Sequence, residues 1–117
     1  MSVKPLTVTF TEVVPSVANL REHWSAKAKR AKRHRRRAWL ELRALGHGCE
    51  FVGPLVVTLT RISPRALDGD NLQSAFKASR DGVADWLGTD DADSRVTWAY
   101  AQERAKTQAV RIEVSPV

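Results

Sequence analysis

The sequence lacks the features of export, membrane insertion, disulfide bonding and zinc binding. Its only cysteine, Cys49, cannot form an internal disulfide. Three histidines at unrelated spacing, His23, His34 and His47, do not make a zinc site with one cysteine. The longest run without a charge, residues 51–60, has ten residues, too few to span a bilayer. With no export signal visible at the N-terminus, these absences predict a cytoplasmic protein with no membrane partner.

Common nucleotide-binding and nucleophile motifs are missing as well. The 6 glycines fit neither a phosphate-binding loop nor a dinucleotide fingerprint, and no serine or cysteine has the partners of a catalytic triad. The chain has 117 residues, of which 43% are hydrophobic, as in one compact domain that spans residues 1–117. A chain of this size buries only about 65% of its unfolded surface. We therefore expect a second copy to bury more of it in a homodimer.

Positive charge is concentrated in one segment. The net charge is +6, and residues 27–37 (KAKRAKRHRRR) contain eight of the 19 Lys and Arg residues and no acid. So dense a run repels itself and is typical of a protein that binds a polyanion, although a short basic run can also be a solvated helix face. We predict a nucleic-acid surface formed by Lys27, Lys29, Arg30, Lys32, Arg33, Arg35, Arg36 and Arg37.

Four segments have the pattern of strands. Apolar residues alternate with other residues in 6–11, 96–100 and 110–114, and 55–62 is rich in β-branched residues and apolar on both faces near its start. Residues 55–62 are predicted to form a buried central strand, and the last two strands to form a hairpin. The expected fold class is therefore α+β (mixed α/β), with a mixed sheet of about four strands.

Two main helices are predicted between these strands. Apolar positions recur at helical spacing from Trp24 to Leu45, so the basic run lies on a helix with its alanines facing inward. Gly46 follows as a stop signal, and a loop is expected up to residue 53. The second helix runs from about 70 to 87 and ends before a glycine. The four tryptophans lie on apolar stripes, which favours core or dimer contacts over stacking against bases.

Seven of the 13 acidic residues lie within residues 68–93. Asp68 and Asp70 flank a glycine where a strand is followed by a helix, and Asp90 and Asp91 follow the end of that helix. Acids just after a helix C-terminus are opposed by the helix dipole, so we expect positive charge beside them. No cap role is predicted for Asp68, Asp90 or Asp91. Clustered carboxylate oxygens are the ligands that Mg²⁺ and Mn²⁺ prefer, so the pattern predicts a divalent-metal site.

A structural role explains other acids of this region equally well. Asp70 and Gln73 have the spacing of a capping box, so Asp70 can simply cap the second helix. Asp81 lies four residues after Lys77 and can form an ion pair with it. Asp85 can be a solvated charge. For the last two acids we prefer this structural interpretation.

Several short motifs occur in a fixed order along the chain. They are Asp68-Gly69-Asp70-Asn71-Leu72, then Lys77 and Asp81-Gly82-Val83 in the following helix, then Asp90-Asp91, and the RIEV of residues 111–114. The segment Pro15–Asn19 precedes the basic helix. Together these features resemble the RusA-type Holliday junction resolvases of bacteria and their phages. The resemblance covers nearly the whole chain, and its D-x-D-N element is fairly specific only in combination with the lysine and the Asp-Asp pair.

The resemblance implies a homodimeric, Mg²⁺-dependent endonuclease. Such an enzyme resolves four-way DNA junctions by paired, symmetric nicks in DNA recombination and repair. By position, Asp68, Asp70 and Asp91 resemble the essential metal-binding acids of the family, and Asp90 is an accessory neighbour. Lys77 resembles the essential lysine. These residues are therefore the expected catalytic and metal-binding set.

The lysine is the point at which the chain departs from the family pattern. In the family it follows the second aspartate of D-x-D-N by one helical turn. Here Ser74 has that place, and Lys77 lies one turn further along on the same side of the helix. Arg61 and Arg65 are alternative sources of this positive charge, and Arg65 is also counted with the DNA-binding residues.

The chemistry of phosphodiester hydrolysis fits this set of residues. A divalent metal generates the nucleophile from water, neutralises the phosphate and assists the departing oxygen. Three carboxylates hold the metal, and a lysine stabilises charge that grows in the transition state or orients the water. Two other functions stay open: a non-catalytic DNA-binding protein whose acids serve as caps and ion pairs, and a basic module that binds RNA.

Overall fold

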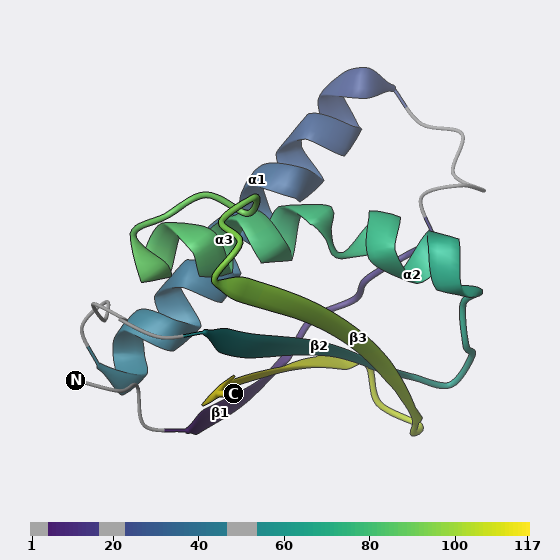
Figure 1. Ribbon diagram of the computed structural model, residues 1–117. Coiled ribbons are helices and arrows are strands. Elements are labelled where there is room, and N and C mark those ends of the chain that lie inside the picture. Colours follow the sequence, from purple (N-terminus) through teal and green to yellow (C-terminus); the bar gives the residue numbers. More distant parts are fainter. Residues whose placement is uncertain (1–4, 17–22, 47–53) are drawn as a thin grey trace.

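The computed structural model describes residues 5–16, 23–46 and 54–117. They form an α+β domain in which a four-stranded mixed sheet is covered on one face by three helices (Figure 1). The predicted fold class is confirmed. The predicted loop after Gly46 falls on residues 47–53, which lie outside the described residues. The segment that begins at Pro15 also lies outside them from residue 17 onward. Within the described ranges, no helix has the length and apolarity that a membrane span requires.

The predicted strands are all present. They are β1 (Leu6–Thr11), β2 (Leu55–Ser63), β3 (Val96–Arg104) and β4 (Ala109–Pro116), in the sheet order β1-β4-β2-β3. β4 is antiparallel to both β1 and β2, and β3 is parallel to β2. Val57 and Leu59 of β2 lie beside Val114 and Ile112 of β4, and all four are fully buried. β2 is therefore the buried central strand that its composition predicts.

The predicted hairpin between the last two strands is wrong. β3 and β4 lie on opposite sides of β2, and the link 105–108 passes the end of β2, where the Ala105 N–H donates to the Ser63 carbonyl at 3.2 Å. Two strand spacings are about 10 Å, which four residues span easily. A short link therefore does not require pairing. Placing β2 between β3 and β4 satisfies the backbone groups on both sides of the most apolar strand.

The basic run lies on α1 (Trp24–Leu45), and the helix ends at Gly46 as predicted. Its N-terminal turns project beyond the other helices (Figure 1), and none of the residues 24–33 is buried. The prediction that the alanines of the run face inward is therefore wrong for Ala28 and Ala31, which are exposed. The C-terminal half packs on the domain through its buried residues His34, Ala38 and Leu42.

The second predicted helix is in fact two helices. α2 (Gly69–Ala75) and α3 (Lys77–Leu87) meet at Phe76, whose φ of −93° and ψ of 1° interrupt the helical backbone. At this break the Phe76 ring is fully buried and stacks on Tyr100 of β3, with 6.3 Å between the ring centroids. Gly88 ends α3 in the left-handed region with a φ of 75°, as a glycine at a helix C-terminus commonly does.

α3 packs on the C-terminal half of α1, and one glycine permits the close approach. A Cβ atom at Gly82 would collide with the carbonyl oxygen of Arg35 and would lie 3.0 Å from the Cβ of Ala38. Because the carbonyl belongs to a helix backbone, it cannot move aside cheaply. Gly82 therefore sets the distance between the two helices.

The four tryptophans have different environments. Trp86 of α3 is buried, which confirms the core prediction for this residue. Trp24 and Trp39 on α1 are 75% and 36% exposed, so a core role is wrong for them and a dimer contact stays a prediction. Trp98 is half-buried on β3.

Candidate functional site

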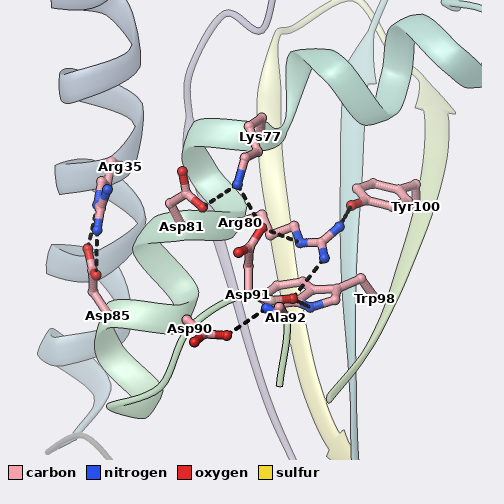
Figure 2. Close-up of polar contacts among 10 residues, drawn as sticks. All are labelled: Arg35, Lys77, Arg80, Asp81, Asp85, Asp90, Asp91, Ala92, Trp98 and Tyr100. Atoms are coloured by element: carbon pink, nitrogen blue, oxygen red, sulfur yellow. Dashed lines mark hydrogen bonds and ion pairs between the residues drawn. The ribbon is translucent and has the colours of Figure 1, made fainter. Parts of the chain in front are cut away.

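Lys77, Asp81 and Asp91 meet at the N-terminal end of α3 (Figure 2). The Lys77 Nζ atom lies 2.8 Å from Asp81 Oδ1 and 2.7 Å from Asp91 Oδ2. The Lys77–Asp81 pair that the spacing predicts is therefore confirmed. Asp91 belongs to the loop between α3 and β3, so Lys77 joins the helix to this loop. Lys77 provides the positive charge that we expected beside Asp91.

Arg80 and Trp98 hold the backbone of the same loop. Arg80 Nη2 donates to the Asp91 carbonyl at 2.8 Å, and Trp98 Nε1 donates to the same oxygen at 3.1 Å. Arg80 Nη1 donates to the Tyr100 hydroxyl at 2.9 Å, and its guanidinium lies 4.8 Å from the centroid of the Trp98 ring. Arg80 Nε is also 3.3 Å from Asp91 Oδ2. Donors from α3 and β3 thus fix the position of Asp91 (Figure 2).

The charges of this cluster stabilise one another. The hydrogen bond from Lys77 holds the pKa of the Asp91 carboxyl below its ordinary value, and the charge of Arg80 acts in the same direction. Hydrogen bonds to Asp81 and Asp91 raise the pKa of Lys77. The Lys77 side chain is 60% exposed and that of Asp91 27% exposed. At neutral pH the site therefore presents an ammonium and a carboxylate that a ligand from solvent can reach.

The other predicted metal ligands do not join this cluster. Asp68 is the N-cap of α2, and its Oδ1 accepts the Asn71 N–H at 3.0 Å, so the cap role predicted for Asp70 belongs to Asp68. Asp70 is exposed in the first turn. Asp90 Oδ1 accepts the Ala92 N–H at 2.9 Å, so Asp90 closes a local turn. The predicted absence of a cap role for Asp68 is therefore wrong.

Carboxylate oxygens are the right kind of donor for Mg²⁺ or Mn²⁺. In the part of the chain that the structure describes, however, no three Asp, Glu, His or Cys side chains lie close enough together to hold a metal ion. The Asp91 carboxylate contacts the protein's own cations, Lys77 and Arg80. In this arrangement the predicted ligands therefore do not fit a metal centre.

A cleft of about 460 Å³ connects the basic helix to the Lys77 cluster. Lys27 and Arg30 of α1 line one side of it, and Lys77 and Asp81 of α3 line the other. The cleft brings two bases of the predicted nucleic-acid surface to the lysine of the predicted catalytic set. These two groups of residues are about 50 positions apart in the sequence, so only the packing of α1 on α3 unites them.

Arg35 and Arg37 of the run are paired within the protein. Arg35 donates to Asp85 through Nε and Nη2, at 2.7 and 2.8 Å, and this contact lowers the pKa of the Asp85 carboxyl. Asp85, predicted to be a solvated charge, thus connects α3 to α1 (Figure 2). Arg37 pairs with Glu41 at 2.9 Å. By contrast, no ion pair within the described ranges involves Lys27, Lys29, Lys32 or Arg36.

The alternative arginines have other surroundings. Arg61 is buried on β2, where its Nε donates to the Val14 carbonyl at 2.8 Å and its Nη1 donates to the Arg65 carbonyl. Burial lowers the pKa of Arg61. Arg65 is exposed beyond the end of β2. The positive charges in contact with Asp91 come from Lys77 and Arg80 instead.

Sequence reasoning missed Arg80, Trp98 and Tyr100. The signal for Arg80 is its spacing, because a residue three positions after Lys77 lies on the same helix face. Trp98 and Tyr100 are two positions apart on a strand and so share one face. Nothing in the sequence shows that this face meets the loop at Asp91, because that contact depends on β3 lying at the edge of the sheet.

A second pair of titratable groups is buried beneath α1. His34 Nε2 lies 3.8 Å from Glu12 Oε1, and the two side chains are 7% and 9% exposed. Burial raises the pKa of Glu12 to about 7, although the charges of Arg37 and Arg33 oppose this shift. Burial also lowers the pKa of His34 to about 4. At neutral pH the histidine is therefore uncharged, and Glu12 is only partly ionised.

Comparison of the chain with models of known protein families gave no match, and comparison with curated protein sequences gave none either. The family resemblance therefore rests on the short motifs of the sequence and stays a prediction.

Proposed function

We propose that this protein is an endonuclease that binds branched DNA through α1 and cuts its backbone beside Lys77 and Asp91, with Mg²⁺ or Mn²⁺ as cofactor. The observation that carries the proposal is the cleft between Lys27 and Arg30 on α1 and Lys77 on α3. A phosphate held by the basic helix at this cleft lies next to an exposed lysine. That lysine is itself in contact with an accessible carboxylate.

The charges of the site support this order of events. The basic helix attracts the DNA backbone, whereas the acids of α3 and its following loop repel it. Lys77 is exposed and has a flexible side chain, so it can exchange Asp91 for a phosphate oxygen when DNA arrives. Lys77 then stabilises negative charge on the phosphate, and the released Asp91 carboxylate can accept a proton from water.

The divalent cofactor enters this proposal through the resemblance and through the oxygen chemistry of the acids. The described acids do not form a metal site in this arrangement. The roles of Lys77 and Asp91 therefore rest on their contact with each other at 2.7 Å.

We also propose that the active form is a homodimer. A four-way junction has two equivalent scissile phosphates, and one Asp91 cluster can address only one of them, so paired nicks need two sites related by a two-fold axis. The exposed rings of Trp24 and Trp39 are apolar surface of the kind that interfaces bury. Light scattering should give the mass of two chains. A monomer that still makes paired cuts would contradict the dimer.

The test is cleavage of a synthetic four-way junction with and without Mg²⁺. We expect the wild type to cut only with the metal. Asp91→Asn should reduce cleavage on the order of 100-fold or more while junction binding in metal-free buffer survives, because the change removes charge and keeps shape. Asp85→Asn is the matched control: Asp85 pairs with α1 and not with Lys77, so most activity should remain. Full activity of Asp91→Asn would refute the assignment of the site.

A non-catalytic DNA-binding protein is the second candidate, and a specific observation favours it. Acids of the region already have structural partners: Asp68 caps α2, Asp90 closes a turn, and Asp93 pairs with Arg95 at 2.7 Å. This candidate predicts a mobility shift of the junction without cleavage at any Mg²⁺ concentration. A stronger shift with RNA than with DNA would instead favour a module that binds RNA.

A further inference from the structure

A separate cavity of about 510 Å³ lies beside the Asp91 cluster, between α2 and the edge strand β3. Its walls are formed by Trp98, Ala99 and Tyr100 of β3, by Arg80 of α3, and by Gly69, Leu72 and Gln73 of α2. Cavities that bind small organic groups have volumes of about 300 to 1,000 Å³. Arg80 and Trp98 belong to the cavity and also bind the Asp91 carbonyl, so the cavity and the proposed cleavage site share two side chains.

The lining has the chemistry of a site for a planar ring. Trp98 and Tyr100 are half-buried, and the Arg80 guanidinium lies over the Trp98 ring and bonds to the Tyr100 hydroxyl. Aromatic rings and arginine planes are the surfaces on which proteins stack single bases. Gln73 is exposed on α2 and offers both a donor and an acceptor to the edge of such a ring. An edge strand adds backbone groups that its sheet does not use.

We propose that this cavity receives one unpaired nucleobase of the DNA strand that is cut. The proposal rests on the proposed function and names how the same site selects its substrate. A base costs least to extrude where its pairing or stacking is weakened, and in an open four-way junction each pair at the branch point is stacked on one side only. A cavity that must be filled therefore favours the branch point over continuous duplex, without any contact that depends on four arms.

An abasic scan tests the proposal. Single nucleotides near the branch point of a four-way junction are replaced in turn by an abasic analogue, and binding is measured by fluorescence anisotropy in EDTA. We expect one position at which the missing base weakens wild-type binding by about 5- to 150-fold, the range for one stacked base. Gln73→Trp fills the cavity from an exposed position, so it should weaken binding of the intact junction equally and be insensitive to that abasic site.

Thr97→Trp is the matched control, because Thr97 is exposed and its neighbour Trp98 points to the other face of β3. It should bind as the wild type does and keep the abasic effect. Circular dichroism confirms that each variant is folded. If no position responds to base removal, or if the losses from Gln73→Trp and from the abasic site add, the cavity holds no base. The abasic scan measures binding and not cleavage. A junction that is bound but not cut with Mg²⁺ therefore contradicts the proposed function and leaves the base-binding proposal standing.

Discussion

The two halves of α1 carry the same kind of charge in opposite surroundings. Residues 24–33 project from the domain, contain no buried side chain, and include lysines without a carboxylate partner in the described part of the chain. The second half is anchored by His34, Ala38 and Leu42, and there Arg35 and Arg37 are held by acids. Charge density in a sequence therefore does not tell which bases are available to a ligand.

The difference also follows the chemistry of the two basic residues. Arginine has a planar group that can bind a carboxylate with two hydrogen bonds, as Arg35 does with Asp85. Lysine is a point charge on a flexible chain, and the projecting half has Lys27, Lys29 and Lys32 besides Arg30 and Arg33. The anchored half thus holds the helix in place, and these three lysines offer their charge to solvent.

The largest expected effect is on how the free energy of unfolding depends on pH, and it comes from the buried pair of Glu12 and His34. Unfolding returns the pKa of Glu12 from about 7 to 4.5, so the folded state binds the extra proton and stability falls as pH rises through this window. Unfolding returns the pKa of His34 from about 4 to 6.5, so stability rises with pH there. In the wild type the two slopes oppose each other between pH 4.5 and 6.5, and stability should change little.

Single variants should expose each slope. The free energy of unfolding of His34→Gln should fall by about 3 kcal/mol between the two pKa values of Glu12, and that of Glu12→Gln should rise by about 3 kcal/mol between those of His34. Urea denaturation in steps of pH measures both. Identical pH profiles for the wild type and both variants would show that the buried pair does not anchor α1.

A salt titration compares the two halves as DNA-binding surfaces. Replacing Lys27, Lys29 and Lys32 by Gln should lower the slope of log K against log salt by about three, since each can meet one phosphate. This equals about 60-fold less change in affinity between 50 and 200 mM salt. Replacing Arg35, Arg36 and Arg37 should lower it by only about one, because two of these are paired. Equal slopes for the two triple variants would show that the two halves of α1 contribute equally to DNA binding.

The packing of α1 on α3 should respond to a single methyl group. Gly82→Ala places its Cβ against the carbonyl of Arg35, and overpacking of this kind costs about 2 kcal/mol of unfolding free energy. Gly69→Ala is the control, because a Cβ there meets nothing within 4 Å, and its stability should be unchanged or slightly raised. Equal stability of the two variants in urea would mean that the helices separate without cost.

The smallest expected effect is that of the ion pair between the helices. Arg35→Gln should cost less than about 1 kcal/mol, because the Arg35 and Asp85 side chains are 53% and 39% exposed and water screens their attraction. A double-mutant cycle with Asp85→Asn measures the coupling. A coupling of several kcal/mol would mean that this ion pair, and not the close approach at Gly82, contributes most to the packing of α1 on α3.

Local patterns predict the parts of the fold that local chemistry decides. Alternation locates the strands, glycine ends α1, and four-residue spacing predicts the Lys77–Asp81 pair. β3 lies beyond β2 because the most apolar strand, β2, takes the central position in the sheet. The short 105–108 link suggests instead that β3 and β4 pair as a hairpin, which they do not. Likewise the helix break at Phe76 depends on burying one ring against Tyr100. These features are set by packing between distant segments, which periodicity does not encode.

The same limit applies to the candidate site. Asp68 and Asp91 are found from their clustering, but clustering does not separate a helix cap from an ion pair. The structure assigns the first to the cap of α2 and the second to Lys77. Sequence analysis misses Arg80 because its partners are a backbone carbonyl and a tyrosine hydroxyl, and neither contact has a sequence pattern.

Geometry and chemistry at Asp91 are carried by different atoms. The main chain is fastened through the carbonyl, which accepts hydrogen bonds from Arg80 and Trp98. The carboxylate carries the negative charge. It forms an ion pair with Lys77 at 2.7 Å and is partly exposed to solvent. The side chain can therefore change its protonation, its partner or even its identity while the loop stays where it is, so variants at this position report on chemistry and not on misplacement.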